Sequence, residues 1–212
     1  MENYFTIKHQ QTAEIEVKKS KFITDIFPLS KNEDVIVSLE NVKKMHYKAN
    51  HHTYAYALGE NGNIRRCSDD GEPSGTAGKP ILNVIEKNHL TNILIVVTRY
   101  FGGIKLGASG LIRAYAASAE AGLTSCTVIK KYVCDNINIV IEYSLYGKLQ
   151  AYLSSCDCEI YQTEFTDNID IYVYIPEELS KAILQDLIAL TNANITINVL
   201  TKVYREKEVT GK

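Results

Sequence analysis

Hydrophobic periodicity divides the chain into two successive series of helices and strands. Early in the first series, apolar residues recur at helical spacing between Val35 and Met45, and Asn32 is the expected N-cap of that helix. Later, the nearly continuous apolar stretch from Asn92 to Tyr100 predicts a buried strand.

Alternation, turn residues and caps predict the other elements of the first series. These are strands at 14–17 and 22–27, a hairpin around Asn61-Gly62, a helix over 78–87, and an alanine-rich helix capped by Ser109 that ends near Gly122. The alanines of the last helix would allow it to pack closely on a sheet.

The pattern restarts after residues 124–131. The alternating segment NINIVIEY predicts a strand, and a helix is expected to begin at Ser144. A hairpin with its turn at Asp167-Asn168 follows. A second helix then begins at Glu177, and the segment from Asn194 forms the last strand. This βαββαβ order is the ferredoxin-like arrangement. The sequence therefore predicts an α+β protein of two domains, residues 1–128 and residues 129–212.

Composition limits the class of protein. With 212 residues, of which 45% are apolar, the chain can bury one large core or two small ones. Its longest purely apolar run, Ile93 to Val97, is too short for a bilayer, and the N-terminal sequence lacks the features of a signal peptide. We therefore expect a cytoplasmic protein without membrane contact, with its five cysteines as reduced thiols and with no metal or cofactor.

Charge is unevenly distributed. Residues 1–132 contain 17 Lys/Arg against 13 Asp/Glu, whereas residues 133–212 contain 6 against 12. The first part thus has a net charge of +4 and the second −6. This asymmetry favours an anionic partner for the first part, with a solvated lysine-rich face as the alternative.

Glycines and charged residues concentrate between Cys67 and Tyr115. Seven of the twelve glycines lie from Gly71 to Gly110. Glycine is favoured where the backbone turns sharply or closely approaches another group. The segment is therefore a candidate for ligand contact, and a set of tight turns is the simpler interpretation.

Within this region the sequence resembles a known family. The segment GKPILNVIEKNHLTNILIVVTRYFGGIKLG, the preceding SDDGEPSGTAG and the following SGLIRAYAASA resemble the IMPACT family, which includes the YigZ-type proteins of bacteria. The resemblance implies a role in translation and its regulation. It also implies a first domain similar to domain IV of elongation factor G and a second similar to its domain V, among folds that often bind RNA.

Three catalytic or nucleotide motifs fail on spacing. A P-loop would need glycine in place of Pro73 and a hydroxyl residue in place of Pro80. A dinucleotide fingerprint would need glycine in place of Lys105. A nucleophile elbow would need glycine in place of Leu111. A loose similarity of LGASGLIRAYAASA to the phosphate loop of small-molecule kinases keeps an enzymatic alternative open. In that alternative Ser109 and the acidic loop, Asp69, Asp70 and Glu72, serve a phosphate-dependent hydrolase or kinase.

The favoured interpretation is recognition of a phosphate backbone. Guanidinium and ammonium groups bind phosphate oxygens, and adjacent glycines let backbone N–H groups approach them. The candidate residues are Arg65, Arg66, Lys79, Arg99, Lys105, Arg113, Gly102 and Gly103, supported by the acidic loop. The alternative for Arg99 is an internal ion pair with Asp69, Asp70 or Glu72.

The sequence thus predicts a non-catalytic protein that binds RNA or the ribosome and regulates translation. A protein partner linked to translation is the second possibility. The eukaryotic relatives, which carry a further domain, are understood to compete for an activator of the amino-acid-starvation kinase.

Overall fold

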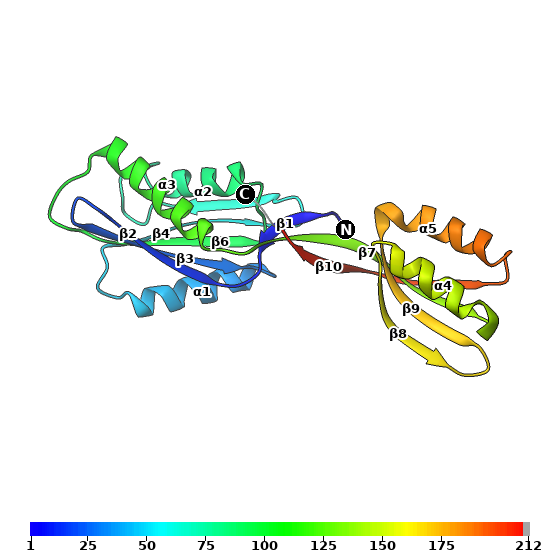
Figure 1. The fold of residues 1–212 in the computed structure, drawn as a ribbon. Helices are drawn as coiled ribbons and strands as arrows, with labels where there is room; N and C mark the ends of the chain where they lie inside the picture. The colour runs from blue at the N-terminus through cyan, green and yellow to red at the C-terminus, as the bar shows by residue number, and fades with distance from the viewer. Residues whose placement is uncertain (210–212) are drawn as a thin grey trace. The chain divides into compact units, whose positions relative to one another are not determined.

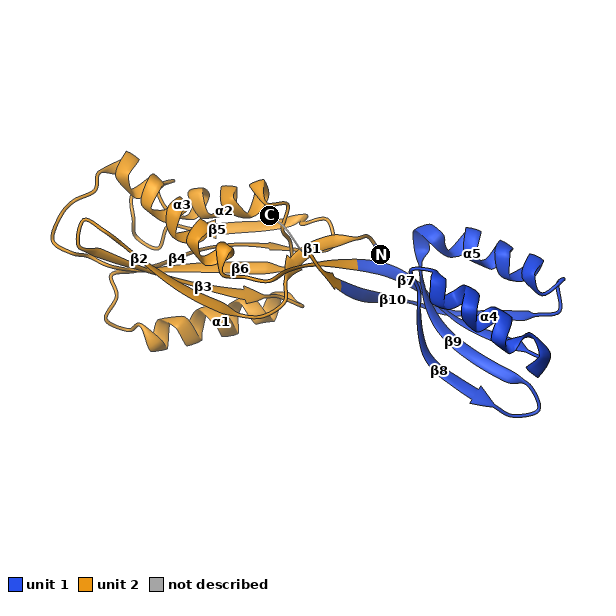
Figure 2. Cartoon of the chain, in the orientation of Figure 1, with its two compact units in different colours: residues 1, 132–206 blue, residues 2–131, 207–212 orange. Residues whose placement is uncertain are grey.

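The computed structural model describes residues 1–209, which form two compact units (Figure 2). The N-terminal unit, orange in Figure 2, contains residues 2–131 and 207–209; the C-terminal unit, blue, contains Met1 and residues 132–206. Both are mixed α+β, as the sequence predicts. That residues 1–128 and 129–212 fold independently stays a prediction.

The N-terminal unit is built on a five-stranded antiparallel sheet with the order β2-β3-β6-β4-β5 (Figure 1). Its strands are β2 (Gln11–Val17), β3 (Ser20–Pro28), β4 (His51–Leu58), β5 (Ile64–Ser68) and β6 (Ile93–Tyr100). Its helices are α1 (Asn32–Met45), α2 (Gly78–Lys87) and α3 (Ala108–Thr124). Helices α2 and α3 cover one face of the sheet, and α1 covers the other.

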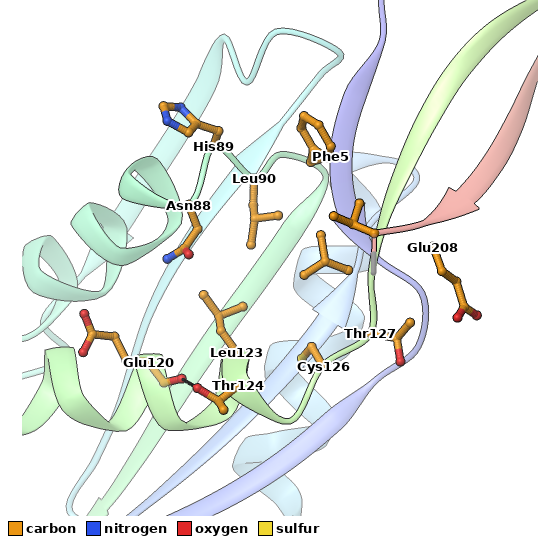
Figure 3. Close-up of a pocket in the computed structure, with 12 residues that line it drawn as sticks. Phe5, Asn88, His89, Leu90, Glu120, Leu123, Thr124, Cys126, Thr127 and Glu208 are labelled. Atoms are coloured by element: carbon orange, nitrogen blue, oxygen red, sulfur yellow. Dashed lines mark hydrogen bonds between the residues drawn. The ribbon is translucent and has the colours of Figure 1, made fainter. Parts of the chain in front are cut away.

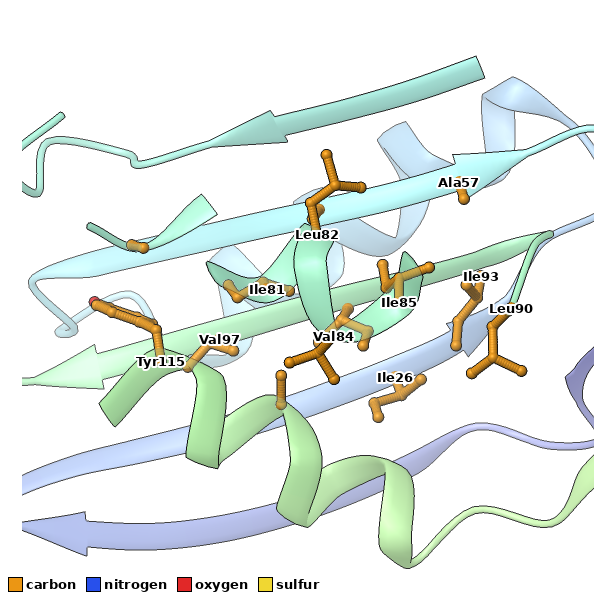
Figure 4. Close-up of a cluster of buried hydrophobic side chains, with 14 of the residues drawn as sticks. Ile26, Ala57, Ile81, Leu82, Val84, Ile85, Leu90, Ile93, Val97 and Tyr115 are labelled. Atoms are coloured by element: carbon orange, nitrogen blue, oxygen red, sulfur yellow. The ribbon is translucent and has the colours of Figure 1, made fainter. Parts of the chain in front are cut away.

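Strand β6 is the centre of this unit because both of its faces are buried. One face packs in the main core with α2 and α3, where Ile81, Ile85, Val97 and Tyr115 lie close together (Figure 4). The other face contributes Leu94 and Val96 to a smaller core under α1. This double burial explains why β6 reads as a continuous apolar stretch in the sequence.

The C-terminal unit has the order β7 (Val128–Ile141), α4 (Tyr143–Ser155), β8 (Glu159–Phe165), β9 (Ile169–Pro176), α5 (Glu177–Leu190) and β10 (Thr196–Glu208). This is the expected βαββαβ order. In its sheet, β7 pairs with β9 and β10, and β9 pairs with β8. Both helices pack on the same face, where Ile137, Ile171, Leu149 and Leu187 form the core.

Three local predictions need correction. An unpredicted strand, β1 (Tyr4–Ile7), pairs with residues 128–131 of β7. The N-cap of α1 is Lys31, not Asn32, and the carboxylate of Asp34 accepts the backbone N–H groups of Ser30 and Lys31. Helix α3 begins after Gly107, so Ser109 lies within its first turn.

Among residues 1–209, no helix is long and apolar enough to span a bilayer.

Candidate functional site

Several connections meet at one end of the N-terminal unit, which we call the loop end. It comprises the β2–β3 turn at residues 18–19, the segment 43–52 at the end of α1, the loop 69–77 and the loop 101–107 (left in Figure 1). Short contacts join these segments: the N–H of Phe101 donates to the side-chain oxygen of Asn50 at 2.9 Å, and that of His52 donates to the carboxylate of Asp70 at 2.6 Å.

A buried ion pair lies beneath the loop end. Arg99 donates from Nη1 to Oε1 of Glu72 at 2.7 Å, and the hydroxyl of Tyr115 donates to the same oxygen at 2.7 Å. Arg99 is 5% exposed and Glu72 is 8% exposed. Burial and then the Glu72 hydrogen bond raise the pKa of Tyr115 far above its usual range, so its hydroxyl remains a donor.

Arg99 and Glu72, both named in the site prediction, are thus partners of each other. The guanidinium of Arg99 is enclosed between the rings of Phe22 and Phe101, at 5.4 and 5.5 Å from their centroids. The internal pairing that the sequence left open is the arrangement observed. Arg99 therefore organises the loops and is not available to a large anion at the surface.

Asp69 and Asp70, the other two acids of the loop, also have partners within the protein. Asp69 accepts the backbone N–H groups of Gly75, Ala77 and Gly78 at 2.8 to 3.0 Å, and it thereby caps the start of α2. Burial alone would raise the pKa of Asp69, but these three bonds outweigh it and lower the pKa. All three acids thus have partners within the protein.

Three of the predicted cations lie on exposed parts of this end. Lys79 lies in the first turn of α2, Lys105 in the loop 101–107, and Arg113 in the second turn of α3. None forms an ion pair with a described residue. They are therefore the predicted residues that the fold leaves available to an anion.

The other two predicted arginines lie elsewhere. Arg65 is next to the β4–β5 turn, where it donates to the carbonyl of Gly62 and pairs with Glu86 at 3.2 Å. Arg66 is exposed in the middle of edge strand β5 and donates to the carbonyl of Arg65. The structure does not bring these two side chains to the loop end.

The predicted glycines have different roles. A Cβ at residue 102 would overlap the backbone carbonyl of Lys19, so only glycine fits at this position. Gly103 has open space around it but a φ of +83°, which is the left-handed region that favours glycine. Gly102 thus fixes the loop 101–107 against the β2–β3 turn.

Five further exposed lysines, which were not among the predicted site residues, lie at the loop end: Lys18, Lys19, Lys43, Lys44 and Lys48. The available signal was the pair of KK dipeptides, each placed where an element ends. Tyr47, 73% exposed, and Phe101, 46% exposed, add aromatic surface to the same end. Eight cations, the five lysines with Lys79, Lys105 and Arg113, therefore surround the loop end, and we call them the basic surface.

The two lysines of the β2–β3 turn occupy a strained conformation. Lys18 and Lys19 have φ values of 46° and 65° between the paired residues Val17 and Ser20, which defines a two-residue turn of the I′ kind. This turn favours Asn-Gly, and a residue with a Cβ costs about 1–2 kcal/mol in the left-handed region. Lysine at both positions is therefore not explained by the stability of the turn.

The adjacent histidines of β4 do not face a common point. His51 contacts the carbonyl of Asp70 whereas His52 contacts that of His46, so the adjacent histidines face opposite sides of the sheet, as strand geometry predicts. Residues 1–209 contain no group of three His, Cys, Asp or Glu side chains that could hold a metal ion.

A separate pocket of about 830 Å³ lies in the N-terminal unit between the ends of α2 and α3 and strand β1 (Figure 3). Leu90, Leu123 and Phe5 give it an apolar wall, and none of the described residues that line it is Lys or Arg. Burial raises the pKa of the Cys126 thiol in this wall to about 11, so it stays protonated at neutral pH. The pocket suits neither phosphate binding nor thiolate chemistry.

Comparison with known proteins identifies the family. The Impact N-terminal domain matches residues 18–123, and a domain of unknown function, DUF1949, matches residues 139–194. The chain is 36% identical to the IMPACT family member YvyE of Bacillus subtilis over 99% of this chain and 96% of that protein. It is 33% identical to the IMPACT family member YigZ of Escherichia coli over 83% and 87%. The chain therefore belongs to the IMPACT family, which confirms the resemblance.

A solved structure is similar over nearly the whole chain. The crystal structure described as that of an hypothetical protein has a TM-score of 0.60 and 28% identity, covering 95% of this chain and 98% of that one. This agrees with the α+β fold. The similarity to domains IV and V of elongation factor G stays a prediction.

Proposed function

We propose that the chain is a non-catalytic RNA- or ribosome-binding protein that regulates translation and that the basic surface is its binding site. The observation that carries this proposal is the segregation of charge at the loop end. Eight exposed cations surround it, while Asp69, Asp70 and Glu72 are all held by internal contacts. Such a surface suits a polyanion because each bound phosphate displaces condensed counterions.

The arrangement of the cations favours RNA over a small phosphate. The lysines and Arg113 come from separate segments of the chain. Exposed Tyr47 and Phe101 provide faces on which unpaired bases can stack. Membership of the IMPACT family adds the link to translation.

Titration with structured RNA at two salt concentrations, together with sedimentation with ribosomes, tests the proposal. We expect binding that weakens steeply as salt rises. No binding at low salt would contradict it. Hydrolysis of Mg-ATP that is lost in Ser109→Ala would instead support the enzymatic alternative.

A further inference from the structure

The sheet of the C-terminal unit has one face without a helix. Helices α4 and α5 pack on the apolar face (Figure 1). The opposite face carries polar and aromatic side chains. The residues of this open face are Asn136 and Asn138 of β7, Glu159, Tyr161, Gln162 and Glu164 of β8, and Asp170, Tyr172 and Tyr174 of β9. Asp170, Tyr172 and Tyr174 alternate along β9 with the buried Ile171 and Val173, so the pleat of the strand places their side chains on the opposite face.

The open face belongs to a strongly acidic unit. Residues 132–206 contain 4 Lys/Arg against 11 Asp/Glu. A net charge of −7 attracts cations and repels phosphate. Tyrosine rings could in principle stack on nucleic-acid bases, but the charge of this unit disfavours RNA as their partner.

The chain itself shows how this face holds a guanidinium group. Arg205 of β10 lies over the ring of Tyr174, at 4.8 Å from its centroid, and donates to both carboxylate oxygens of Glu159 at 2.6 Å. Glu159 and Tyr174 are register partners on β8 and β9, and Tyr161 stacks on Tyr174 at 4.3 Å. A carboxylate and a tyrosine ring on neighbouring strands thus form a cradle for arginine.

The same chemistry recurs further along the two strands, where no cation of the described residues is paired with it. Glu164 lies directly opposite Asp170, and Tyr172 lies beside both. Glu164 receives a hydrogen bond from Gln162 and Asp170 receives one from Asn138, but neither forms an ion pair within residues 1–209. Two like charges in a cross-strand pair are destabilising, and a cation between them would remove that cost.

We propose that the open face binds an arginine-containing basic segment of a partner protein. One guanidinium of that segment stacks on Tyr172 and donates to Glu164 and Asp170, as Arg205 does with Tyr174 and Glu159. Arginine fits better than lysine because its planar fork both stacks on a ring and donates two parallel hydrogen bonds. This proposal does not depend on RNA binding by the N-terminal unit.

The test uses the full chain and two blocked peptides, one of alternating Arg and Gly and one of alternating Lys and Gly, each with four cations. Binding is measured by calorimetry for the native chain, for Glu164→Gln with Asp170→Asn, and for a control with the same charge change, Glu142→Gln with Glu178→Gln. The control residues are exposed at the starts of α4 and α5. Unfolding curves verify that each variant is folded.

We expect the arginine peptide to bind more tightly than the lysine peptide, and the Glu164/Asp170 variant to weaken arginine binding at least tenfold while the control changes it less than twofold. A third variant, Tyr172→Leu, should abolish the preference for arginine. Equal weakening in the first variant and the control would overturn the proposal, because it would indicate only general charge attraction. Binding of a single-stranded RNA that depends on Tyr172 would also overturn it.

Discussion

The backbone carbonyl of Lys19 lies directly against Gly102, so closely that any Cβ at residue 102 would overlap it. The hydroxyl of Ser20 reinforces this approach by accepting the N–H of Gly102 at 3.2 Å. The contact joins the β2–β3 turn to the loop 101–107 and so brings together Lys18, Lys19 and Lys105. The shape of the basic surface therefore depends on a glycine.

Replacing Gly102 by alanine should destabilise the protein by about 1–3 kcal/mol, because the backbone of Lys19 must move away from the new methyl group. Denaturant unfolding measures this change. Gly147→Ala is the control: that glycine lies within α4 with open space around it, so the substitution should stabilise by about 0.5–1 kcal/mol. A neutral Gly102→Ala would show that the two segments are not tightly joined.

Arg99→Ala should lower stability by about 3–5 kcal/mol, since it leaves the carboxylate of Glu72 buried without its cation. RNA affinity per folded molecule should change less than twofold, because Arg99 is enclosed. Tyr115→Phe provides a milder variant, which removes one hydrogen bond to Glu72 and should cost about 1 kcal/mol. If Arg99→Ala kept normal stability but lost binding, its assignment as an organising residue would be wrong.

The effect of Asp69→Ala should depend on pH. The folded-state pKa of Asp69 lies below the ordinary value of 3.8, so its stabilising effect is present above about pH 4 and is lost as the pH falls through the folded-state value. The variant should be less stable by about 1–2 kcal/mol at pH 7, because three backbone N–H groups lose their acceptor. Unfolding curves of both proteins at pH 7 and at pH 3 should show a smaller difference at the lower pH; a constant difference would argue against the capping role.

Periodicity predicted most of the fold because the buried strands and amphipathic helices have clear patterns. Helix α2 has the predicted bounds, and β6 differs by a single residue. Strand β1 was missed because it has only four residues and its partners in β7 are 121 or more positions distant in the sequence. Local sequence carries no information about such a partner.

The candidate site was less predictable than the fold. Composition drew attention to the glycine-rich loops, but it could not distinguish buried Arg99 from exposed Lys105, since the distinction depends on which face of β6 contacts α3. The lysines at 18–19 and 43–48 are far from the glycine-rich segment in sequence. They join it only because antiparallel strands bring alternate connections to the same end of a sheet.

The strained turn gives a prediction in which stability and binding change in opposite directions. Lys18→Asn with Lys19→Gly places the favoured residues in the I′ turn and should stabilise the protein by about 1–2 kcal/mol. RNA binding should weaken because two cations of the basic surface are lost. A thermal unfolding curve and an RNA titration of the same sample measure both effects. A more stable protein with unchanged RNA binding would show that the turn is not part of the binding surface.

The salt dependence of RNA binding in two matched double variants tests the basic surface most directly. Lys79→Gln with Lys105→Gln removes two cations from the loop end, whereas Lys87→Gln with Lys181→Gln removes two exposed cations elsewhere; Lys79 and Lys87 lie at opposite ends of α2. Each phosphate contact contributes about 0.9 to the slope of log affinity against log salt. We predict that the first variant lowers the magnitude of this slope by about 2 and that the second leaves it unchanged. Equal slopes in both variants, or no slope in the native chain, would contradict the account.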